Sequence, residues 1–194
     1  MARVLQNPIS HFLTTSILFF FLTIPSIQSN YGFVKVVSEN KIKLKKEKLS
    51  HLRFFWHDIF TGKNPSAATV VQAPSNTSRT SFGRIVVIDD PLTEGPQLSS
   101  KIIGRAQGLY TLASQQVVSL LMAMNFAFIE GKYKGSTITV LGRNPVRDKV
   151  REMPVIGGSG LFRFASGYVQ AKTYKFNMTS GDATVEYNVC VLHY

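Results

Sequence analysis

The segment HLRFFWHD, residues 51–58, alternates between two kinds of side chain. Its even-numbered positions hold Leu52, Phe54, Trp56 and Asp58, whereas its odd-numbered positions hold two histidines, an arginine and a phenylalanine. Because successive side chains of a strand point to opposite faces, this pattern predicts a strand whose even face points into the core. The carboxyl group of Asp58 would then end a row of buried apolar side chains.

The chain from residue 49 onward is rich in β-branched and aromatic residues, and turn-forming clusters recur at short spacing. These features are typical of an all-β domain, and short connections favour an antiparallel up-and-down barrel without exposed edges. The apolar run 117–129 is long enough for a helix, but the hairpin-like residues 131–135 after it favour a strand. We predict a loop over residues 142–154 and eight strands, near residues 50–59, 68–73, 83–90, 101–112, 117–129, 135–142, 160–176 and 183–193.

One of these predicted strands carries small residues on one face, where Gly104, Ala106 and Gly108 lie between Ile102 and Tyr110. An eight-stranded barrel is just wide enough to hold one small ligand when its interior is not packed solid. The small residues therefore favour an internal cavity, although glycines also allow close packing of strands. Both interpretations stay open from the sequence.

The N-terminal region is typical of a secretory signal peptide. After Arg3 no Lys, Arg, Asp or Glu occurs before Lys35, and this gap contains the apolar run 12–24, which Pro25 ends. The run is shorter than the ~20 residues that cross a bilayer, so a membrane anchor is the weaker alternative. We predict a signal peptide over residues 1–29 and a secreted, extracellular protein without membrane attachment after cleavage.

Residues 30–48 form a polar, lysine-rich arm before the predicted barrel domain, residues 49–194. A solvated arm is the simpler interpretation, and adhesion to an acidic cell-wall polysaccharide is the functional one. The whole chain carries a net charge of +11, with 22 basic and 11 acidic residues. Because no RNA- or DNA-binding motif accompanies this charge, nucleic acid is not an expected partner.

Two sequons fit the secretory pathway, and we predict glycans at Asn76 and Asn177.

The single cysteine, Cys190, excludes an internal disulfide and a cysteine-based zinc site, and we interpret it as a packed thiol. The histidines after residue 30 form no short-spaced pair, and no phosphate-binding glycine motif is present. We therefore predict no metal and no cofactor.

The remaining chemistry is that of a carboxyl group in an apolar pocket. Beside Phe54 and Trp56, the carboxyl group of Asp58 would lose solvation, and its pKa would rise toward neutrality. Such a group can donate or accept a proton, although a strand-end aspartate that fixes a turn is the simpler alternative. The segment 147–152 is a charged loop, and one of its arginines would be able to reach over the mouth of the barrel.

Six segments carry a family resemblance: FWHDI (55–59), GRAQG (104–108), MNF (124–126), GST (135–137), VREMPVIGGSG (150–160) and GDATVEYN (181–188). In order and spacing they resemble the dirigent family of plants, over nearly the whole chain after the signal peptide. The resemblance implies the barrel of allene oxide cyclase-like proteins and assembly into a homotrimer.

The resemblance also implies work on reactive phenols. In the lignan-forming branch, an external laccase or peroxidase makes phenoxy radicals, and the dirigent protein binds two of them and fixes the faces that couple. In the pterocarpan synthase branch, a hydroxyisoflavan alcohol loses water through a quinone methide and closes a ring. Both routes need a pocket that orients a flat aromatic molecule and offers acid–base groups at its polar ends.

Residue roles follow from the resemblance at matching positions. Asp58 and Arg151 match a catalytic aspartate and a pocket arginine, and Tyr110 matches a pocket tyrosine. Asn144 stands where the lignan-forming branch has a second pocket aspartate, and Leu112 stands where that branch has a second tyrosine. These departures favour the subgroup that includes pterocarpan synthases. The predicted pocket wall comprises Phe54, Trp56, Tyr110, Leu112 and Asn144.

Three functions follow as hypotheses. The first is a dirigent protein that imposes stereoselectivity on phenoxy-radical coupling or quinone-methide cyclisation of a small phenolic substrate, with no redox centre of its own. The second is a pterocarpan synthase, a hydro-lyase that needs no oxidase. The third is a non-catalytic cell-wall or defence protein that binds polysaccharide through the arm.

Overall fold

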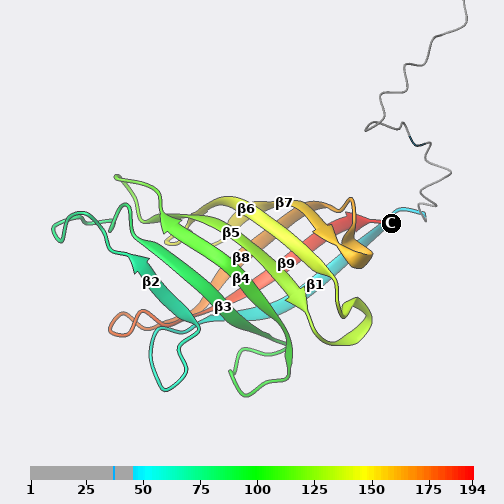
Figure 1. Cartoon of the computed structure of the whole chain (residues 1–194), viewed down its shortest axis with the longest axis horizontal. Helices are drawn as coiled ribbons and strands as arrows, with labels where there is room; N and C mark the ends of the chain where they lie inside the picture. Colours follow the sequence, from blue (N-terminus) through cyan, green and yellow to red (C-terminus); the bar gives the residue numbers. More distant parts are fainter. Residues whose placement is uncertain (1–36, 38–45) are drawn as a thin grey trace, which may run out of the picture. The chain divides into compact units, whose positions relative to one another are not determined.

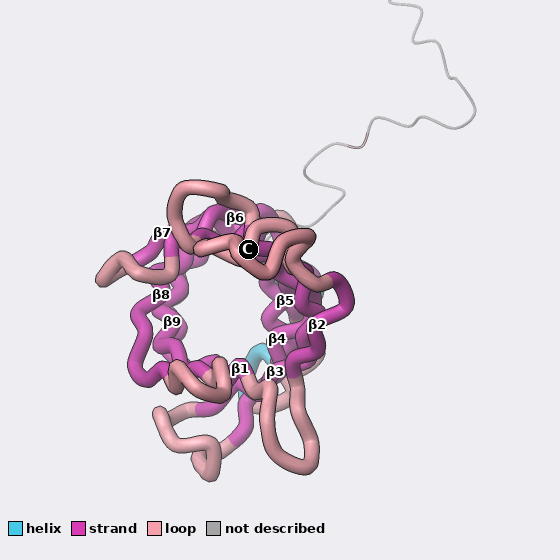
Figure 2. Tube along the Cα trace, turned by 90° about the vertical axis from the view of Figure 1, so that its left-hand side faces the viewer, coloured by secondary structure: helices cyan, strands magenta, loops and turns pink. Residues whose placement is uncertain are grey.

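The computed structural model describes residue 37 and residues 46–194, and the latter form a β-barrel (Figures 1 and 2). The predicted signal peptide and nearly all of the lysine-rich arm lie outside the described residues. No helix of the described part is long and apolar enough to cross a membrane. The strands are β1 (Lys48–Asp58), β2 (Ala67–Val71), β3 (Ile85–Thr93), β4 (Ile102–Leu112), β5 (Ser119–Phe128), β6 (Thr137–Pro145), β7 (Arg151–Ser159), β8 (Ser166–Phe176) and β9 (Ala183–His193), with short 3-10 helices η1 (Gly131–Tyr133) and η2 (Gly160–Phe162).

The barrel closes where the two ends of the sheet meet. All pairings are antiparallel, in the order β1-β9-β8-β7-β6-β5-β4-β3-β2, and β1 also pairs with β3. The first part of β3 pairs with β2, while its end pairs with β1 through Leu92 and Thr93. Eight strands therefore form the closed barrel and β2 flanks it, which confirms the predicted all-β barrel of eight antiparallel strands.

The eight strands that form the barrel are not all the ones that were predicted. We predicted β2 as a barrel strand and a loop over residues 142–154, which includes the first four residues of β7. The sequence of β7 contains a proline and two glycines, which are typical of turns. Yet Arg151, Met153 and Val155 alternate as buried residues along it, and its pairing with β6 shifts register beyond Val155. The predicted strand 160–176 begins only at Ser166, because η2 precedes it.

The alternation of β1 holds on its even face, where Phe54, Trp56 and Asp58 are buried. Its odd face is buried too at the end of the strand, which the sequence pattern did not indicate. Phe55 packs edge-to-face on an aromatic ring of β8, and His57 bonds to Thr93 of β3. Both residues lie where β1 closes the barrel against β3, and Phe55 pairs there with Thr93.

The glycines of β4 pack strands closely. A Cβ atom on Gly104 would lie 2.5 Å from the carbonyl oxygen of Ala127 on β5, and Gly108 meets Ala123 of β5 at still closer range. Of the two interpretations left open by the sequence, close strand approach explains these positions. Free volume inside the barrel lies at one end instead.

Candidate functional site

A cavity of about 620 Å³ opens at the end of the barrel opposite the C terminus, on the left in Figure 1. The end of β1, the ends of β4 and β6 and the starts of β7 and β9 converge there. Its lining is mostly apolar, a composition typical of small-molecule sites. Of the predicted site residues, it brings together Trp56, Asp58, Tyr110, Leu112, Asn144 and Arg151.

Asp58 ends β1 and is 6% exposed. Its Oδ2 atom accepts a hydrogen bond of 2.8 Å from the Tyr110 hydroxyl, while Oδ1 has no partner within residues 46–194. Burial raises the pKa of Asp58 to about 7, against the opposing effects of the Tyr110 hydrogen bond and the positive charge of Arg84. Asp58 can therefore hold or release a proton near neutral pH.

Arg151 begins β7 and is 3% exposed. Its Nε atom donates to Oδ1 of Asn144 on β6 at 3.0 Å, and its Nη1 atom has no partner in the described structure. Burial lowers the pKa of Arg151, but a guanidinium stays charged in proteins. Asn144 therefore orients a buried positive charge whose free N–H group belongs to a residue of the cavity wall.

Phe54 does not line the cavity, contrary to the prediction. It is fully buried, edge-to-face with Phe126 at 4.9 Å and stacked on Tyr187 at 6.1 Å. The strand alternation was correct, but Phe54 lies two residues deeper in the barrel than Trp56 and fills the core.

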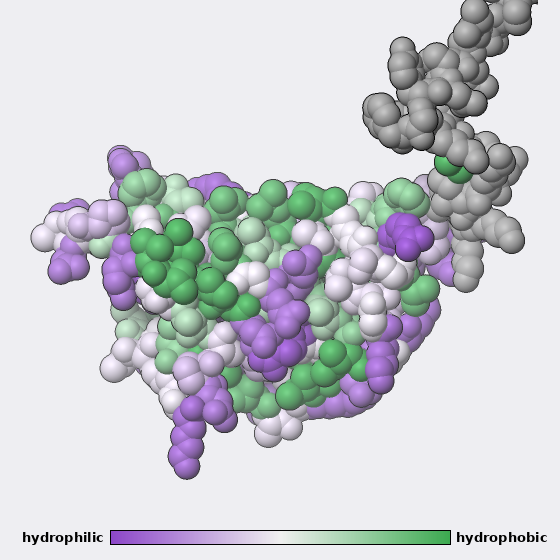
Figure 3. All heavy atoms as spheres, viewed as in Figure 1, coloured by the Kyte–Doolittle hydropathy of each residue, from purple (hydrophilic) through white to green (hydrophobic). Residues whose placement is uncertain are grey.

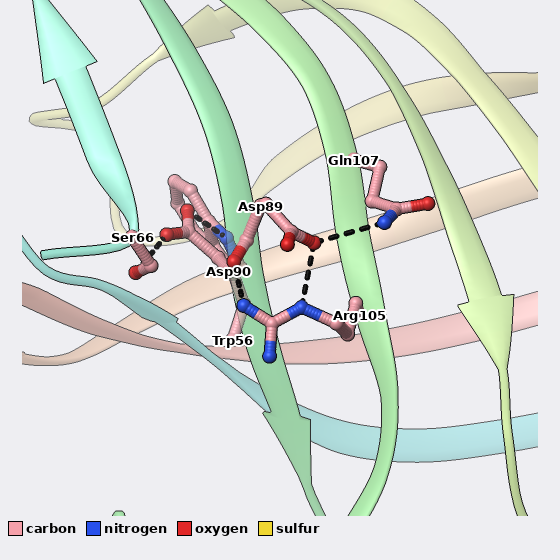
Figure 4. Close-up of polar contacts among 6 residues, drawn as sticks. All are labelled: Trp56, Ser66, Asp89, Asp90, Arg105 and Gln107. Carbon is pink, nitrogen blue, oxygen red and sulfur yellow. Dashed lines mark hydrogen bonds and ion pairs between the residues drawn. The ribbon is translucent and has the colours of Figure 1, made fainter. Parts of the chain in front are cut away.

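The sequence did not reveal two buried polar side chains near the cavity. Tyr187 of β9 is fully buried, and its hydroxyl group has no partner in the described part of the chain. Burial also raises the pKa of Tyr187. Asp90 of β3 accepts a hydrogen bond of 2.7 Å from the indole nitrogen of Trp56 (Figure 4), and burial raises its pKa to about 8, with the nearby Asp58 adding to the shift. In the sequence, only the presence of aromatic residues in β9 and of aspartates in β3 could have indicated these two residues.

The mouth of the cavity combines apolar and basic side chains. The guanidinium group of Arg84 lies 5.1 Å from the centre of the Phe60 ring and donates to Thr69. The predicted charged loop supplies the exposed Arg147 to the wall, whereas Arg151 lies within β7. The cavity wall therefore carries an exposed positive charge at Arg147 and a buried one at Arg151.

The predicted glycosylation sites and the single cysteine do not line the cavity. The side chains of Asn76 and Asn177 are exposed. Cys190 is a free, half-buried thiol. Within residues 46–194, no three His, Cys, Asp or Glu side chains are grouped to hold a metal ion.

Comparisons with known proteins point to one family. The model of the family described as Dirigent-like protein matches residues 49–192. Dirigent protein 7 of Arabidopsis thaliana is 53% identical over 87% of this chain and 90% of its own, and pterocarpan synthase 1 of Glycyrrhiza echinata is 44% identical over 90% and 93%. The solved structure of the pterocarpan synthase dirigent protein GePTS1 covers 83% of this chain and 99% of its own, with 44% identity and a TM-score of 0.77.

Proposed function

Because the chain belongs to the dirigent family, we propose that its cavity holds a flat phenolic molecule and fixes the stereochemistry of the bond that forms. One observation carries this proposal. Asp58 Oδ1 and Arg151 Nη1 are buried polar atoms without a partner in the described structure, and both residues line one apolar cavity. Buried polar groups are nearly always satisfied, so a bound ligand with polar ends is the natural partner.

The apolar wall and the two polar groups have different tasks. Trp56 and Leu112 offer surfaces against which an aromatic ring lies, and binding in one orientation replaces a random encounter. Asp58 exchanges a proton with a phenol or quinone-methide oxygen. The Arg151 guanidinium stabilises negative charge as it develops on such an oxygen in a site that excludes water.

In the coupling route, the protein supplies geometry only. An external laccase or peroxidase removes one electron and one proton from each phenol, and two radicals then join by one new bond. The protein determines which faces meet. Asp58 then accepts or donates the protons that accompany ring closure of the coupled quinone methide.

Dehydration of the pterocarpan synthase kind is the second candidate function, and Asn144 is the observation that favours it. With an amide at this position, Asp58 is the only carboxylic acid in the cavity wall as far as the structure describes it. Asp58 gives its proton to the leaving hydroxyl, the C–O bond breaks, water departs, and the phenolic proton goes to solvent. A second phenol oxygen then forms the new C–O bond and returns its proton to Asp58, while the quinone-methide oxygen takes a proton from solvent.

We further propose that the protein is secreted, glycosylated at Asn76 and Asn177, and trimeric. An apolar row on the outer wall supports self-association. Val87 of β3, Leu109 of β4 and Leu141 of β6 are partly exposed and lie in register, with Ala123 of β5 between the last two. Figure 3 shows hydrophobic areas on the face of β3, β4 and β5, separated by hydrophilic side chains. Binding of acidic wall polysaccharide through the arm stays a third, non-catalytic possibility.

Two parallel reactions test the function. The protein without its signal peptide is incubated with a hydroxyisoflavan alcohol and no oxidase, and separately with coniferyl alcohol and a laccase. Optically pure, ring-closed product in the first reaction establishes a hydro-lyase. Enantiomeric excess only in the second establishes a coupling guide, and racemic product in both contradicts the proposal for these substrates. Retention of the protein on pectin with and without residues 30–48 tests the third possibility.

A further inference from the structure

Behind the cavity wall lies a second carboxyl group, that of Asp90 on β3, whose side chain is fully buried. Both of its oxygen atoms are hydrogen bonded. Oδ2 accepts from the indole N–H of Trp56 at 2.7 Å, and Oδ1 accepts from the hydroxyl of Ser66. Figure 4 shows the Asp90 carboxyl between these two donors. Asp90 is not part of the cavity wall, so it cannot touch a ligand there directly.

The indole ring of Trp56 is held from three directions. Asp90 binds its N–H group, and the rings of Tyr110 and Tyr187 meet it edge-to-face with centroids 6.4 Å and 6.2 Å away. Tyr110 in turn donates to Asp58. A continuous set of contacts therefore runs from Asp90 through the indole ring to the carboxyl group that faces the ligand.

Ser66 anchors the other side of Asp90 to the backbone. The N–H group of Ser66 donates to the carbonyl of Ile59, and its carbonyl accepts from the N–H group of Asp89. The carboxyl group of Asp90 thus has a fixed position on the barrel. Because a buried donor without an acceptor is costly, the indole ring has one strongly favoured orientation as long as this acceptor is present.

We propose that Asp90 is a positioning residue for the substrate cavity: it holds the Trp56 indole ring in the single orientation against which the aromatic substrate lies. This inference rests on the proposed function. The orientation of the ring decides which face of a flat substrate is covered and which is open to attack. Loss of the acceptor therefore relaxes stereoselectivity more than it reduces binding.

Neighbouring positions provide matched variants. In Asp90→Ala the acceptor is lost, whereas in Asp90→Asn an amide oxygen can still accept from Trp56 and the amide N–H can donate to Ser66. Asp89→Asn is the control, since Asp89 is exposed and binds Arg105 and Gln107 on the outer wall (Figure 4). Trp56→Phe removes the same hydrogen bond from the other side and keeps an aromatic ring in the wall.

The wild-type protein first shows which of the two test reactions it directs. The enantiomeric ratio of the product of that reaction is then measured for each variant. We expect Asp90→Ala and Trp56→Phe to lower the ratio by about fivefold or more, Asp90→Asn to stay within about twofold, and Asp89→Asn to be unchanged. In the Trp56→Phe background, Asp90→Ala should have no further effect, because Asp90 acts through the indole N–H. Trp56 is the single tryptophan, so its fluorescence anisotropy reports ring mobility directly and should fall in Asp90→Ala.

A purely structural role for Asp90 would lower the unfolding midpoint in urea and leave the enantiomeric ratio of the folded protein unchanged, which would overturn the inference. If Asp90→Ala does not fold, Trp56→Phe decides alone, and an unchanged ratio in that variant also overturns it. If the wild-type protein gives racemic product and its Trp56 fluorescence is not quenched by either phenol, the proposed function itself fails. The two failures are therefore distinguishable.

Discussion

The hydroxyl group of Tyr110 donates a hydrogen bond of 2.8 Å to Oδ2 of Asp58, which leaves Oδ1 as the carboxyl oxygen without a protein partner in the described structure. The two residues come from β4 and β1, which are not paired with each other in the sheet. Their contact spans the inside of the barrel end. It divides the carboxyl group into one oxygen that Tyr110 holds and one buried oxygen without a hydrogen-bond partner in the described structure.

Removal of this hydrogen bond should change the pH dependence of activity. The Tyr110 hydroxyl stabilises the Asp58 carboxylate and so holds its pKa below the value that burial alone would give. In Tyr110→Phe the pKa of Asp58 should rise. The part of the pH–activity profile that reports ionisation of Asp58 should therefore shift to higher pH by about 1 unit. A pH profile of the directed reaction measures this shift. Tyr133→Phe, a change in a half-buried tyrosine that does not line the cavity, is the control and should leave the profile in place.

Folding stability should fall as the pH rises through the range in which Asp58 ionises. The folded-state pKa of about 7 lies above the unfolded value, so the native state binds the proton more tightly between pH ~4 and ~7. The contribution of Asp58 to the free energy of unfolding is therefore fully present below pH ~4 and lost as the pH passes ~7. The free energy of unfolding of Asp58→Asn minus that of wild type should be roughly 3 kcal/mol larger at pH 8 than at pH 4.

Urea unfolding of both proteins at several pH values measures this difference. Asp89→Asn is the comparison. The Arg105 and Gln107 contacts lower the pKa of Asp89, so the effect of this substitution on the free energy of unfolding should change with pH in the opposite direction. An Asp58→Asn difference that does not vary with pH would mean that Asp58 ionises normally.

The Arg151 guanidinium should contribute to affinity for phenolic ligands. Truncation in Arg151→Ala removes the buried positive charge and leaves Asn144 without its donor, so the dissociation constant should rise about tenfold or more. Quenching of Trp56 fluorescence by the phenol measures it, since this ring lines the same cavity. Arg163→Ala, an exposed arginine just after η2, is the control and should bind as wild type. Equal affinity for the Arg151 variant would remove this residue from the binding site.

The close approach of β4 and β5 at Gly104 should make this position intolerant of any side chain. The added Cβ atom of Gly104→Ala would lie 2.5 Å from a backbone oxygen of β5, and a backbone atom cannot move aside as a flexible side chain can. We expect a loss of roughly 2 kcal/mol or more in the free energy of unfolding in urea. Gly131→Ala is the comparison, since its turn has open space for a Cβ atom, and it should lose only the strain of its positive φ angle. Similar losses in both would contradict the packing explanation.

Strand alternation predicted from the sequence that Trp56 and Asp58 face the interior, because one face of β1 is apolar over several residues. It could not predict that Phe54 lies below the cavity, since the depth of a side chain depends on how the opposite wall fills the barrel. The pairing of Arg151 with Asn144 joins β6 and β7, and residue spacing alone does not place them together. Their shared pocket followed only from the family resemblance.

The sequence also misplaced two segments for physical reasons. The proline and glycines of β7 resemble a loop, yet the strand tolerates them because its pairing with β6 is irregular there. The predicted strand 83–90 ended before Pro91, whereas β3 continues through Pro91 to Thr93 and pairs with β1. Barrel closure is a contact distant in sequence, so local patterns carry little information about it.

The enantiomeric excess of the product made by wild type and by Asp58→Asn is the most direct test of the central claim. The asparagine variant keeps the size of the side chain and an oxygen that can accept from Tyr110, but it cannot exchange a proton. The account predicts high enantiomeric excess with wild type and a strong loss of directed product with Asp58→Asn, while the barrel stays folded by circular dichroism. Equal yield and equal enantiomeric excess in the two proteins would contradict the assignment of the cavity chemistry to Asp58.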